Sequence, residues 1–241
     1  MDLTSSYQSA LPDDVRSRYE IRETRNAAAI ICVTNATEMN EIIGVLRGFS
    51  LTREDILRAG GNKSLVATRI DQSFRDLGWR EGRHDTKITS VLKLMPYKEA
   101  GETKPVVRET EVYNEGYKVD NVKGRVALDV EWNAKDGNLD RDLSAYRALY
   151  DSGIIDAGVL ITRTQDDLRE LAVKLGLPDT SGLLASDLDE AGDVSSSRGR
   201  FSTTTTTNLT KLEPRLTRGD GGGCPILAIA ITAKCFTLQN K

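Results

Sequence analysis

Three acidic residues cluster in one stretch of the sequence, KVDNVKGRVALDVEWN (118–133). Because side chains alternate along a β-strand, Asp129 and Glu131 would share one face of a strand in this stretch. A bend at Lys123–Gly124 would let the chain fold back and bring Asp120 beside them. Like charges placed together are costly unless a cation neutralises them, and carboxylate oxygens are ligands that Mg²⁺ prefers. The spacing therefore predicts a magnesium site.

The other face of the same strand is apolar, with Val126, Leu128, Val130 and Trp132 at alternate positions. An alternative is that the acids only decorate a solvent-exposed face, since short motifs have many chance matches. The following segments favour the site. Residues 138–153 have a helical pattern, and IIDAGVLIT (154–162) is almost wholly apolar, as in strands covered on both faces. The acidic strand is therefore predicted to lie centrally in a sheet.

The pattern of apolar residues predicts an α/β fold, with a central mixed β-sheet flanked by helices. The whole chain, 1–241, is predicted to be a single domain, with a loose tail at 1–15 and a flexible acidic, serine-rich loop or insertion at 179–200. We expect strands at 19–25, 86–94, 106–116, 117–132, 154–162 and 225–236. We expect helices at 26–33, 36–49, 51–59, 62–79, 138–153 and 164–178.

The composition excludes several classes of protein. The 241 residues carry a net charge of −3 and 39% are hydrophobic, which is typical of a soluble globular protein. No apolar run is long enough to span a membrane and we find no secretion signal, so we expect a cytoplasmic protein. Cys32, Cys224 and Cys235 sit in apolar runs and are expected to be buried, reduced thiols. With His84 as its single histidine, the sequence favours neither a zinc site nor a catalytic triad, and it has no nucleotide-binding loop.

The acidic stretch resembles the catalytic core of a nuclease family. Its D-x8-D-x-E pattern is similar to the PD-(D/E)xK core of type II restriction endonucleases, in the form found in the BglII, BstYI and BamHI group, where glutamate or glutamine replaces the usual lysine. The resemblance extends over the helix after Glu131 and IDAGVLI (155–161), and more weakly over FRDLGWRE (74–81) and the apolar C-terminal strand. Asp129 departs from the glutamate most common at its position but keeps a carboxylate.

The resemblance implies roles for these residues. Asp120, Asp129 and the backbone carbonyl of Val130 would ligate Mg²⁺, and Glu131 would ligate, orient or help to deprotonate the attacking water. Hydrolysis would leave a 5′-phosphate and a 3′-hydroxyl. In such enzymes a fourth acid often comes from an upstream helix. Asp71 is the candidate here, with a solvated helical acid as the alternative.

DNA recognition would fall to residues just beyond the catalytic strand and to the C-terminal segment EPRLTRGDGGG (213–223), which we expect to be a loop. Asn, Lys and Arg side chains read base edges or hold phosphates, and Asp accepts a hydrogen bond from cytosine. Generic surface charge is the alternative for the basic residues. The threonine run at 203–207 is interpreted as a strand rather than as a phosphate-binding segment. The candidate DNA-binding residues are Asn133, Lys135, Arg215, Arg218 and Asp220.

A palindromic DNA site is best matched by a two-fold dimer in which each subunit cuts one strand. We therefore expect a homodimer bound to double-stranded DNA, with the helix at 138–153 or its neighbours as a candidate interface. The leading prediction is a type II restriction endonuclease. Two alternatives stay open: another magnesium-dependent DNA nuclease of the same core, acting in repair or defence, and a non-catalytic DNA-binding protein with that fold.

Overall fold

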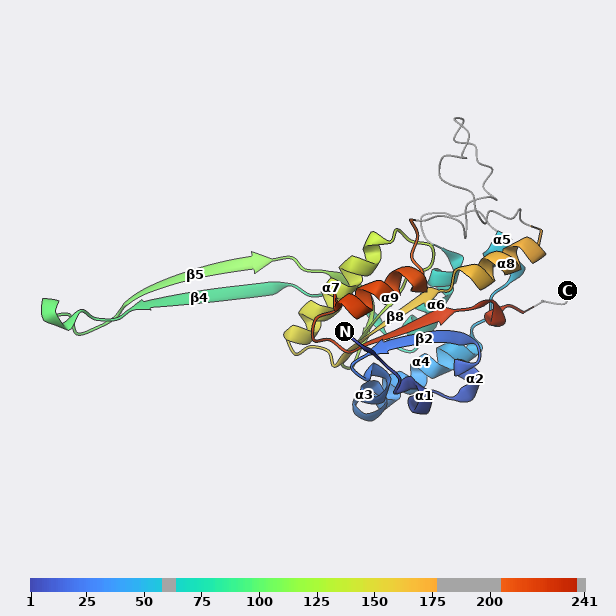
Figure 1. Cartoon of the computed structure of the whole chain (residues 1–241). Coiled ribbons are helices and arrows are strands. Elements are labelled where there is room, and N and C mark those ends of the chain that lie inside the picture. Colours follow the sequence, from blue (N-terminus) through green and yellow to red (C-terminus); the bar gives the residue numbers. More distant parts are fainter. Residues whose placement is uncertain (58–63, 177–204, 238–241) are drawn as a thin grey trace, which may run out of the picture.

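A seven-stranded mixed sheet runs through the centre of the protein (Figure 1). The computed structural model describes residues 1–57, 64–176 and 205–237. The strands lie in the order β1-β2-β9-β8-β7-β6-β3. Neighbours among β7, β8 and β9 are parallel, and the other pairings in this sheet are antiparallel. This arrangement confirms the predicted fold class. The strands are β1 (Leu3–Thr4), β2 (Tyr19–Thr24), β3 (Arg80–Arg83), β6 (Lys118–Lys123), β7 (Val126–Val130), β8 (Ala157–Arg163) and β9 (Ile226–Ile231).

Helices cover both faces of the sheet, because its central strands are buried along their whole length. One apolar core lies between the sheet and α3 (Ala27–Thr34), α4 (Ala36–Gly48), α6 (Leu65–Asp76) and α8 (Asp166–Lys174), with contributions from the short helices α1 (Tyr7–Ala10), α2 (Asp13–Arg16) and α5 (Arg53–Leu57). The other lies beneath α7 (Gly137–Asp151) and α9 (Leu209–Arg218). The acidic strand β7 therefore has a helical layer on each side.

Most of the predicted elements are confirmed, with small shifts at their ends. The helices predicted at 26–33, 36–49, 62–79, 138–153 and 164–178 are α3, α4, α6, α7 and α8. Of the helix predicted at 51–59, α5 covers Arg53–Leu57, and residues 58–59 lie outside the described ranges. The strands predicted at 19–25, 154–162 and 225–236 are β2, β8 and β9, and the stretch 117–132 divides into β6 and β7 at the expected bend.

The N-terminal segment is part of the core, so the predicted loose tail at 1–15 is wrong. It forms β1, α1 and α2, and Leu11 and Val15 are buried among the apolar residues beneath them. The next two helices, α3 and α4, together have the length and composition of a membrane span, but they are bent by 117°. Within the described residues, no single helix is long and apolar enough to cross a membrane.

The C-terminal segment also differs from the prediction. The loop expected around Arg215 is the helix α9, because Leu209, Leu212 and Leu216 form an apolar stripe that packs on the sheet. Of the predicted threonine strand at 203–207, residues 205–207 are described, and they make only an isolated bridge at Thr206. The predicted flexible loop at 179–200 lies outside the described residues.

The cysteines and the histidine have no special environment. Cys32, Cys224 and Cys235 are free thiols, of which the last two are buried as predicted and Cys32 is only half-buried. Burial raises the pKa of Cys224 to about 12, so this thiol stays protonated at neutral pH. His84 lies half-buried between β3 and the next strand, and its backbone amide donates to the Tyr117 carbonyl. None of these side chains forms part of the site described below.

Two of the predicted strands do not join the central sheet. β4 (Thr86–Leu94) and β5 (Val106–Asn114) pair with each other in unbroken antiparallel register, and a short 3₁₀ turn (Lys98–Ala100) lies between them. They form a narrow ribbon that projects far from the body of the protein (Figure 1). We call residues 86–114 the arm. Both predicted strands are confirmed, and they pair apart from the central mixed sheet.

Candidate active site

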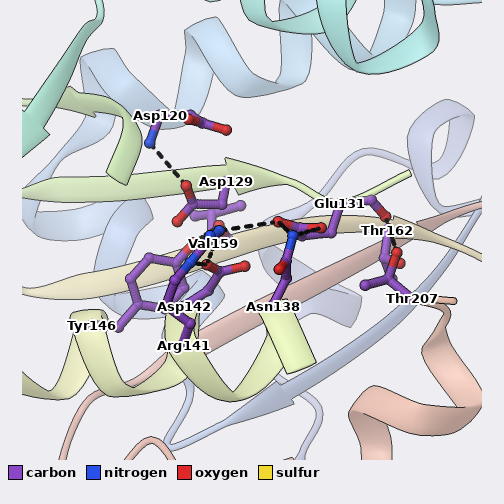
Figure 2. Close-up of polar contacts among 10 residues, drawn as sticks. All are labelled: Asp120, Asp129, Glu131, Asn138, Arg141, Asp142, Tyr146, Val159, Thr162 and Thr207. Carbon is purple, nitrogen blue, oxygen red and sulfur yellow. Dashed lines mark hydrogen bonds and ion pairs between the residues drawn. The ribbon is translucent and has the colours of Figure 1, made fainter. Parts of the chain in front are cut away.

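The β6–β7 hairpin brings two of the predicted acids together. The register of the two strands sets Asp120 opposite Asp129. The backbone amide of Asp120 donates to Asp129 Oδ1 at 2.8 Å. In Figure 2 the Asp120 carboxylate lies apart from those of Asp129 and Glu131. The bend at Lys123–Gly124 thus places Asp120 next to the acidic pair, with its main chain as the point of contact.

Asp129 and Glu131 lie on the face of the sheet that α7 covers, where they are 2% and 4% exposed. Glu131 directly follows β7 and is fixed through its main chain. Its amide donates to the Ile161 carbonyl at 2.8 Å, and its own carbonyl accepts hydrogen bonds from the hydroxyls of Thr162 and Thr207. The alternation predicted for β7 therefore holds, and it presents both carboxylates to a buried layer rather than to solvent.

Helix α7 adds three polar side chains to this layer (Figure 2). Asn138 Nδ2 lies 3.3 Å from each carboxylate oxygen of Glu131. Asp142 is fully buried, and its Oδ1 accepts from Arg141 Nη2 at 3.0 Å. The same Arg141 nitrogen lies 3.6 Å from Glu131 Oε1, so one guanidinium bridges two carboxylates. We call Asp129, Glu131 and Asp142 the acid cluster.

Asp142 is not among the site residues predicted from the sequence, although the sequence carries a signal for it. Asp142 directly precedes Leu143 and follows Leu139 by three positions, and both leucines lie on the buried face of α7. Residues three apart on a helix face the same side, so Asp142 falls within the apolar stripe. An acid there is expensive unless something neutralises it.

Burial and mutual repulsion hold the acid cluster in an unusual state of protonation. Burial raises the pKa of Asp142 to about 8, and the charge of Glu131 adds to the effect. Burial also raises the pKa of Glu131 to about 7, against the opposing hydrogen bond from Asn138. The pKa of Asp129 is raised well above its ordinary value by burial and by the charge of Asp142. Without a neutralising partner, these acids resist ionisation at neutral pH.

The donor chemistry of the acid cluster fits a divalent cation. Asp129 Oδ2 and Asp142 Oδ2 are buried without a hydrogen-bond partner. A hard cation would satisfy both oxygens and offset the repulsion that raises the three pKa values. Within the described ranges, no three His, Cys, Asp or Glu side chains are already gathered as metal ligands.

Tyr146 closes the acid cluster on the side of β8. Its hydroxyl donates to the Val159 carbonyl at 2.7 Å, and its side chain is fully buried. The ring lies so close to Gly158 that a Cβ at this position would come within 2.4 Å of it. Glycine at 158 is therefore needed for α7 to pack on β8 at this distance. Because Asp142 is one helical turn before Tyr146, this close packing holds Asp142 against the sheet.

Comparison with known families decides what kind of protein carries this site. A family model described as restriction endonuclease BglII/BglIII matches residues 19–231. The chain belongs to this family. It is therefore a type II restriction endonuclease, a site-specific endodeoxyribonuclease whose substrate is DNA, and enzymes of this type generally use a divalent metal. Among curated proteins, no sequence matches the chain.

The restriction endonuclease holds the segment after β7 in place with a buried arginine. Asn133 adopts a left-handed conformation with φ of 56°, and its Oδ1 accepts from Arg163 Nε at 2.6 Å. Arg163 is fully buried and also donates to Gln165 and Thr206. Its burial lowers its pKa to about 9. The side chain of Asn133 thus links β7 to β8, whereas the neighbouring Lys135 is exposed.

The remaining candidate DNA-binding residues of the endonuclease lie on α9 and at its end. Arg215 makes two parallel hydrogen bonds to Asp140 of α7, at 2.7 and 2.9 Å. Arg218 pairs in the same way with Asp220. The side chain of Arg218 is 63% exposed, against 17% for Arg215. Each arginine already has a carboxylate, so binding a base or phosphate would compete with an existing ion pair.

Asp71, the candidate fourth acid, lies on the other side of the sheet from the acid cluster of the endonuclease. It is 1% exposed on α6, so the alternative of a solvated helical acid is wrong. Its Oδ1 accepts from Asn121 Nδ2 at 2.9 Å. Asn121 pairs with Leu128, whose side chain belongs to the core on the face opposite Asp129. Asp71 and Asp142 are therefore separated by the strands that carry the hairpin.

Proposed function

We propose that the endonuclease hydrolyses phosphodiester bonds at a short palindromic site in double-stranded DNA, with Mg²⁺ as its cation. Each cut leaves a 5′-phosphate and a 3′-hydroxyl. The acid cluster supports this proposal most directly, because Asp129 and Asp142 bury carboxylate oxygens that have no hydrogen-bond partner. Such oxygens are costly in a folded protein unless a cation binds them.

Asp120, Asp129 and the Val130 carbonyl are the proposed ligands of the cation. Asp129 offers its free Oδ2, and the main chain of Asp120 is anchored to the other oxygen of the same carboxylate. Rotation of the half-buried Asp120 side chain would then supply a second carboxylate to the same ion. Bound Mg²⁺ lowers the pKa of its water and offsets the charge that develops on the phosphate.

Glu131 is the proposed group that positions the attacking water and accepts its proton. Burial raises the pKa of Glu131 to about 7, the range in which a general base works well at neutral pH. Asn138 and Arg141 hold the carboxylate in one orientation. The water oxygen bonds to phosphorus as the bond from phosphorus to the 3′ oxygen breaks. The 3′ oxygen takes a proton from solvent, and Glu131 returns the water proton to solvent.

A homodimer would match a palindromic site, with one acid cluster for each DNA strand. Among the proposed DNA-binding residues, Lys135 and Arg218 are exposed, and of these two Arg218 would have to exchange its ion pair with Asp220 for a contact with DNA. Asn133, Arg215 and Asp220 would contact DNA only by giving up the hydrogen bonds described above. We therefore expect Lys135 and Arg218 to matter first for affinity, through phosphates, rather than for sequence choice.

Digestion of phage DNA tests the proposal. With Mg²⁺ the wild type should give discrete fragments with 5′-phosphate ends, and EDTA should stop the reaction. An Asp129→Asn variant should not cut but should still retard a DNA fragment on a gel. A smear would indicate a nuclease without a defined site. A salt-sensitive gel shift without any cutting would indicate a DNA-binding protein that has lost catalysis.

A further inference from the structure

The arm has two faces of different character. Its strands pair Ile88 with Val112 and Leu94 with Val106, and side chains at every second position share a face. One face carries five large aliphatic residues and a single charge, and we call it the apolar face: Ile88, Leu92, Leu94, Val106 and Val112. The opposite face carries the other four charges of the two strands, Lys87, Lys93, Glu109 and Glu111, together with Val91, Val107 and Tyr113. The arm is thus amphipathic, like a strand pair that lies on the surface of a larger structure.

Nothing in the described part of this chain covers the apolar face. Its five aliphatic side chains are between 42% and 55% exposed. The arm projects away from the central sheet, so the body of the same subunit does not cover the apolar face (Figure 1). A two-stranded ribbon alone is marginally stable, so the arm would gain stability if its apolar face were covered.

The base of the arm is braced, so the arm is held in a defined direction. Asp85 accepts hydrogen bonds from the Tyr113 hydroxyl at 2.7 Å, from the Gly116 amide at 3.1 Å and from Arg83. These bonds lower the pKa of Asp85 to about 2. At Gly116 a Cβ would come within 1.5 Å of the His84 carbonyl oxygen, so the two segments of backbone at the base of the arm lie in close contact that only glycine permits. A partner would therefore meet a preformed surface.

The charges of the arm do not fit DNA. A surface that follows a phosphate backbone needs clustered cations. The apolar face has one cation, Arg108, among its aliphatic residues. On the opposite face, Glu109 and Glu111 accompany Lys87 and Lys93, and Glu111 already pairs with Lys87 at 2.9 Å. Aliphatic residues with few charges are instead typical of interfaces between identical subunits.

The size of the apolar face also favours a second copy of this chain. Nine residues at about 3.4 Å each give a face about 30 Å long and about 10 Å wide, or about 300 Å². One such face covered by a small partner buries too little for a stable complex. In a two-fold dimer each subunit covers the arm of the other. Two apolar faces and the two partner surfaces over them, at about 300 Å² each, then lose about 1,200 Å² of accessible surface in total, which is the lower end of the range for specific interfaces.

We propose that the apolar face of the arm packs against a second copy of this chain and holds the homodimer together. The inference extends the two-fold assembly of the proposed function by naming its surface, and it does not depend on the cleavage reaction. Leu92 lies between Ile88 and Leu94 along this face. Val91, its neighbour on the opposite face, has nearly the same exposure, 50% against 54%. The two positions therefore form a matched pair for mutation.

Sedimentation without DNA tests the inference. The wild type should be a dimer at low micromolar concentration. Leu92→Glu should raise the dimer dissociation constant by about 100-fold, because the added carboxylate would have to be desolvated among aliphatic side chains even where it pairs with Arg108, its cross-strand neighbour. Val91→Glu should leave it within about twofold, since its face stays in solvent. A monomeric wild type, or a dimer equally tight in Leu92→Glu, would overturn the inference. Weaker DNA binding by Leu92→Glu at unchanged mass would also overturn it, in favour of a DNA contact.

Thiol labelling gives a second measurement that does not depend on a disruptive charge. Ser90 lies on the apolar face and Thr89 on the opposite one. Ser90→Cys should react slowly with a maleimide in the dimer and quickly after dilution to monomer, whereas Thr89→Cys should react quickly in both. Equal rates at the two positions in the dimer would overturn the inference. Cleavage of phage DNA by either variant is measured separately, so a failure of the proposed nuclease function can be distinguished from a failure of the proposed dimer interface.

Discussion

The acid cluster and the arm depart from the usual distribution of side chains in opposite directions. The acid cluster buries three carboxylates, at 0–4% exposure, in a place where hydrophobic residues would be stable. The apolar face of the arm exposes five aliphatic side chains at positions where polar or charged residues would be expected. An unpaired buried charge costs several kcal/mol, and an aliphatic side chain left in water forgoes about 1.5–3 kcal/mol. On the proposals above, a cation would offset the first cost and a second subunit the other.

The two regions also differ in how they connect to the rest of the fold. The acid cluster is held by β7, β8 and α7, through bonds such as that from Tyr146 to Val159. The arm is held only at its base, by Asp85. A change in the acid cluster should therefore alter both chemistry and stability, whereas a change in the arm should alter association and leave the core intact.

Replacement of Asp129 by Asn should abolish cleavage while the fold is kept. We expect a loss of at least about 1,000-fold in cleavage rate, because metal-based charge stabilisation is worth several kcal/mol and each 1.36 kcal/mol is tenfold. The measurement is single-turnover cleavage of a DNA fragment that carries the site. Asp151→Asn, an exposed acid on α7, is the control and should cut normally. Cleavage by Asp129→Asn at the wild-type rate would remove Asp129 from the site.

Replacement of Asp142 by Asn should separate stability from activity. Without a divalent cation, the variant should gain about 1–2 kcal/mol in free energy of unfolding at neutral pH, because the asparagine is neutral without the proton that the buried Asp142 has to take up on folding. Cleavage should fall about 10- to 100-fold, as for residues that orient metal ligands. Urea unfolding with EDTA measures the first effect, and cleavage with Mg²⁺ the second. If Asp142→Asn is less stable than the wild type, Asp142 is a structural acid satisfied by Arg141.

The pH dependence of stability should show the raised pKa values of the acid cluster. The folded protein without cation keeps protons on Glu131 and Asp142, with pKa values of about 7 and 8, that the unfolded chain releases above about pH 4.5. The folded state thus binds more protons between these limits, so the free energy of unfolding falls as pH rises, by up to about 1.4 kcal/mol per pH unit for each group.

Thermal unfolding in EDTA should therefore give a lower Tm at about pH 8.5 than at about pH 6, and Mg²⁺ should raise the Tm more at the higher pH because it competes with the protons. Asp142→Asn should flatten this dependence. A Tm in EDTA that rises with pH across this range would contradict the raised pKa values. The arm has no buried acid, so shortening it should leave the pH dependence unchanged.

The sequence was sufficient where local periodicity decides the structure. The alternation in β7 identified which side chains accompany Asp129, and Gly124 marked the bend that sets Asp120 opposite it. The spacing of Leu139, Leu143 and Tyr146 identified α7. In these elements, side-chain period and turn residues agree with the fold, so each can be assigned without knowledge of its neighbours.

The sequence was insufficient where contacts between distant elements decide the outcome. Alternation in β4 and β5 predicts two strands, but it does not say that they pair apart from the central sheet. The helix α9 was missed because Pro214 and the glycines after Arg218 are typical of a loop, although packing of Leu212 and Leu216 on the sheet stabilises it. Asp71 is the fourth acid that the sequence suggests, because spacing within a helix does not reveal which face of a sheet the helix covers.

Shortening of the arm should have the smallest effect on the core and gives the clearest test of the contrast. Residues 88–112 can be replaced by an Asn-Gly turn, because Lys87 and Tyr113 are cross-strand partners and such turns join paired strands directly. The base with Asp85 and Tyr113 is retained. We expect the free energy of unfolding of the monomer to change by less than about 1 kcal/mol, since a lone two-stranded ribbon is itself marginally stable.

The Tm of the wild type should rise with protein concentration, because dimer formation stabilises the folded state by mass action, and the shortened variant should lose this dependence. Differential scanning calorimetry over a range of concentrations measures both, and Val91→Glu is the control that should behave like the wild type. If the shortened variant is unfolded at every concentration at which the wild type is folded, the arm contributes to the fold of a single chain. Its exposed aliphatic residues would then need an explanation within the monomer, and the contrast with the acid cluster would no longer hold.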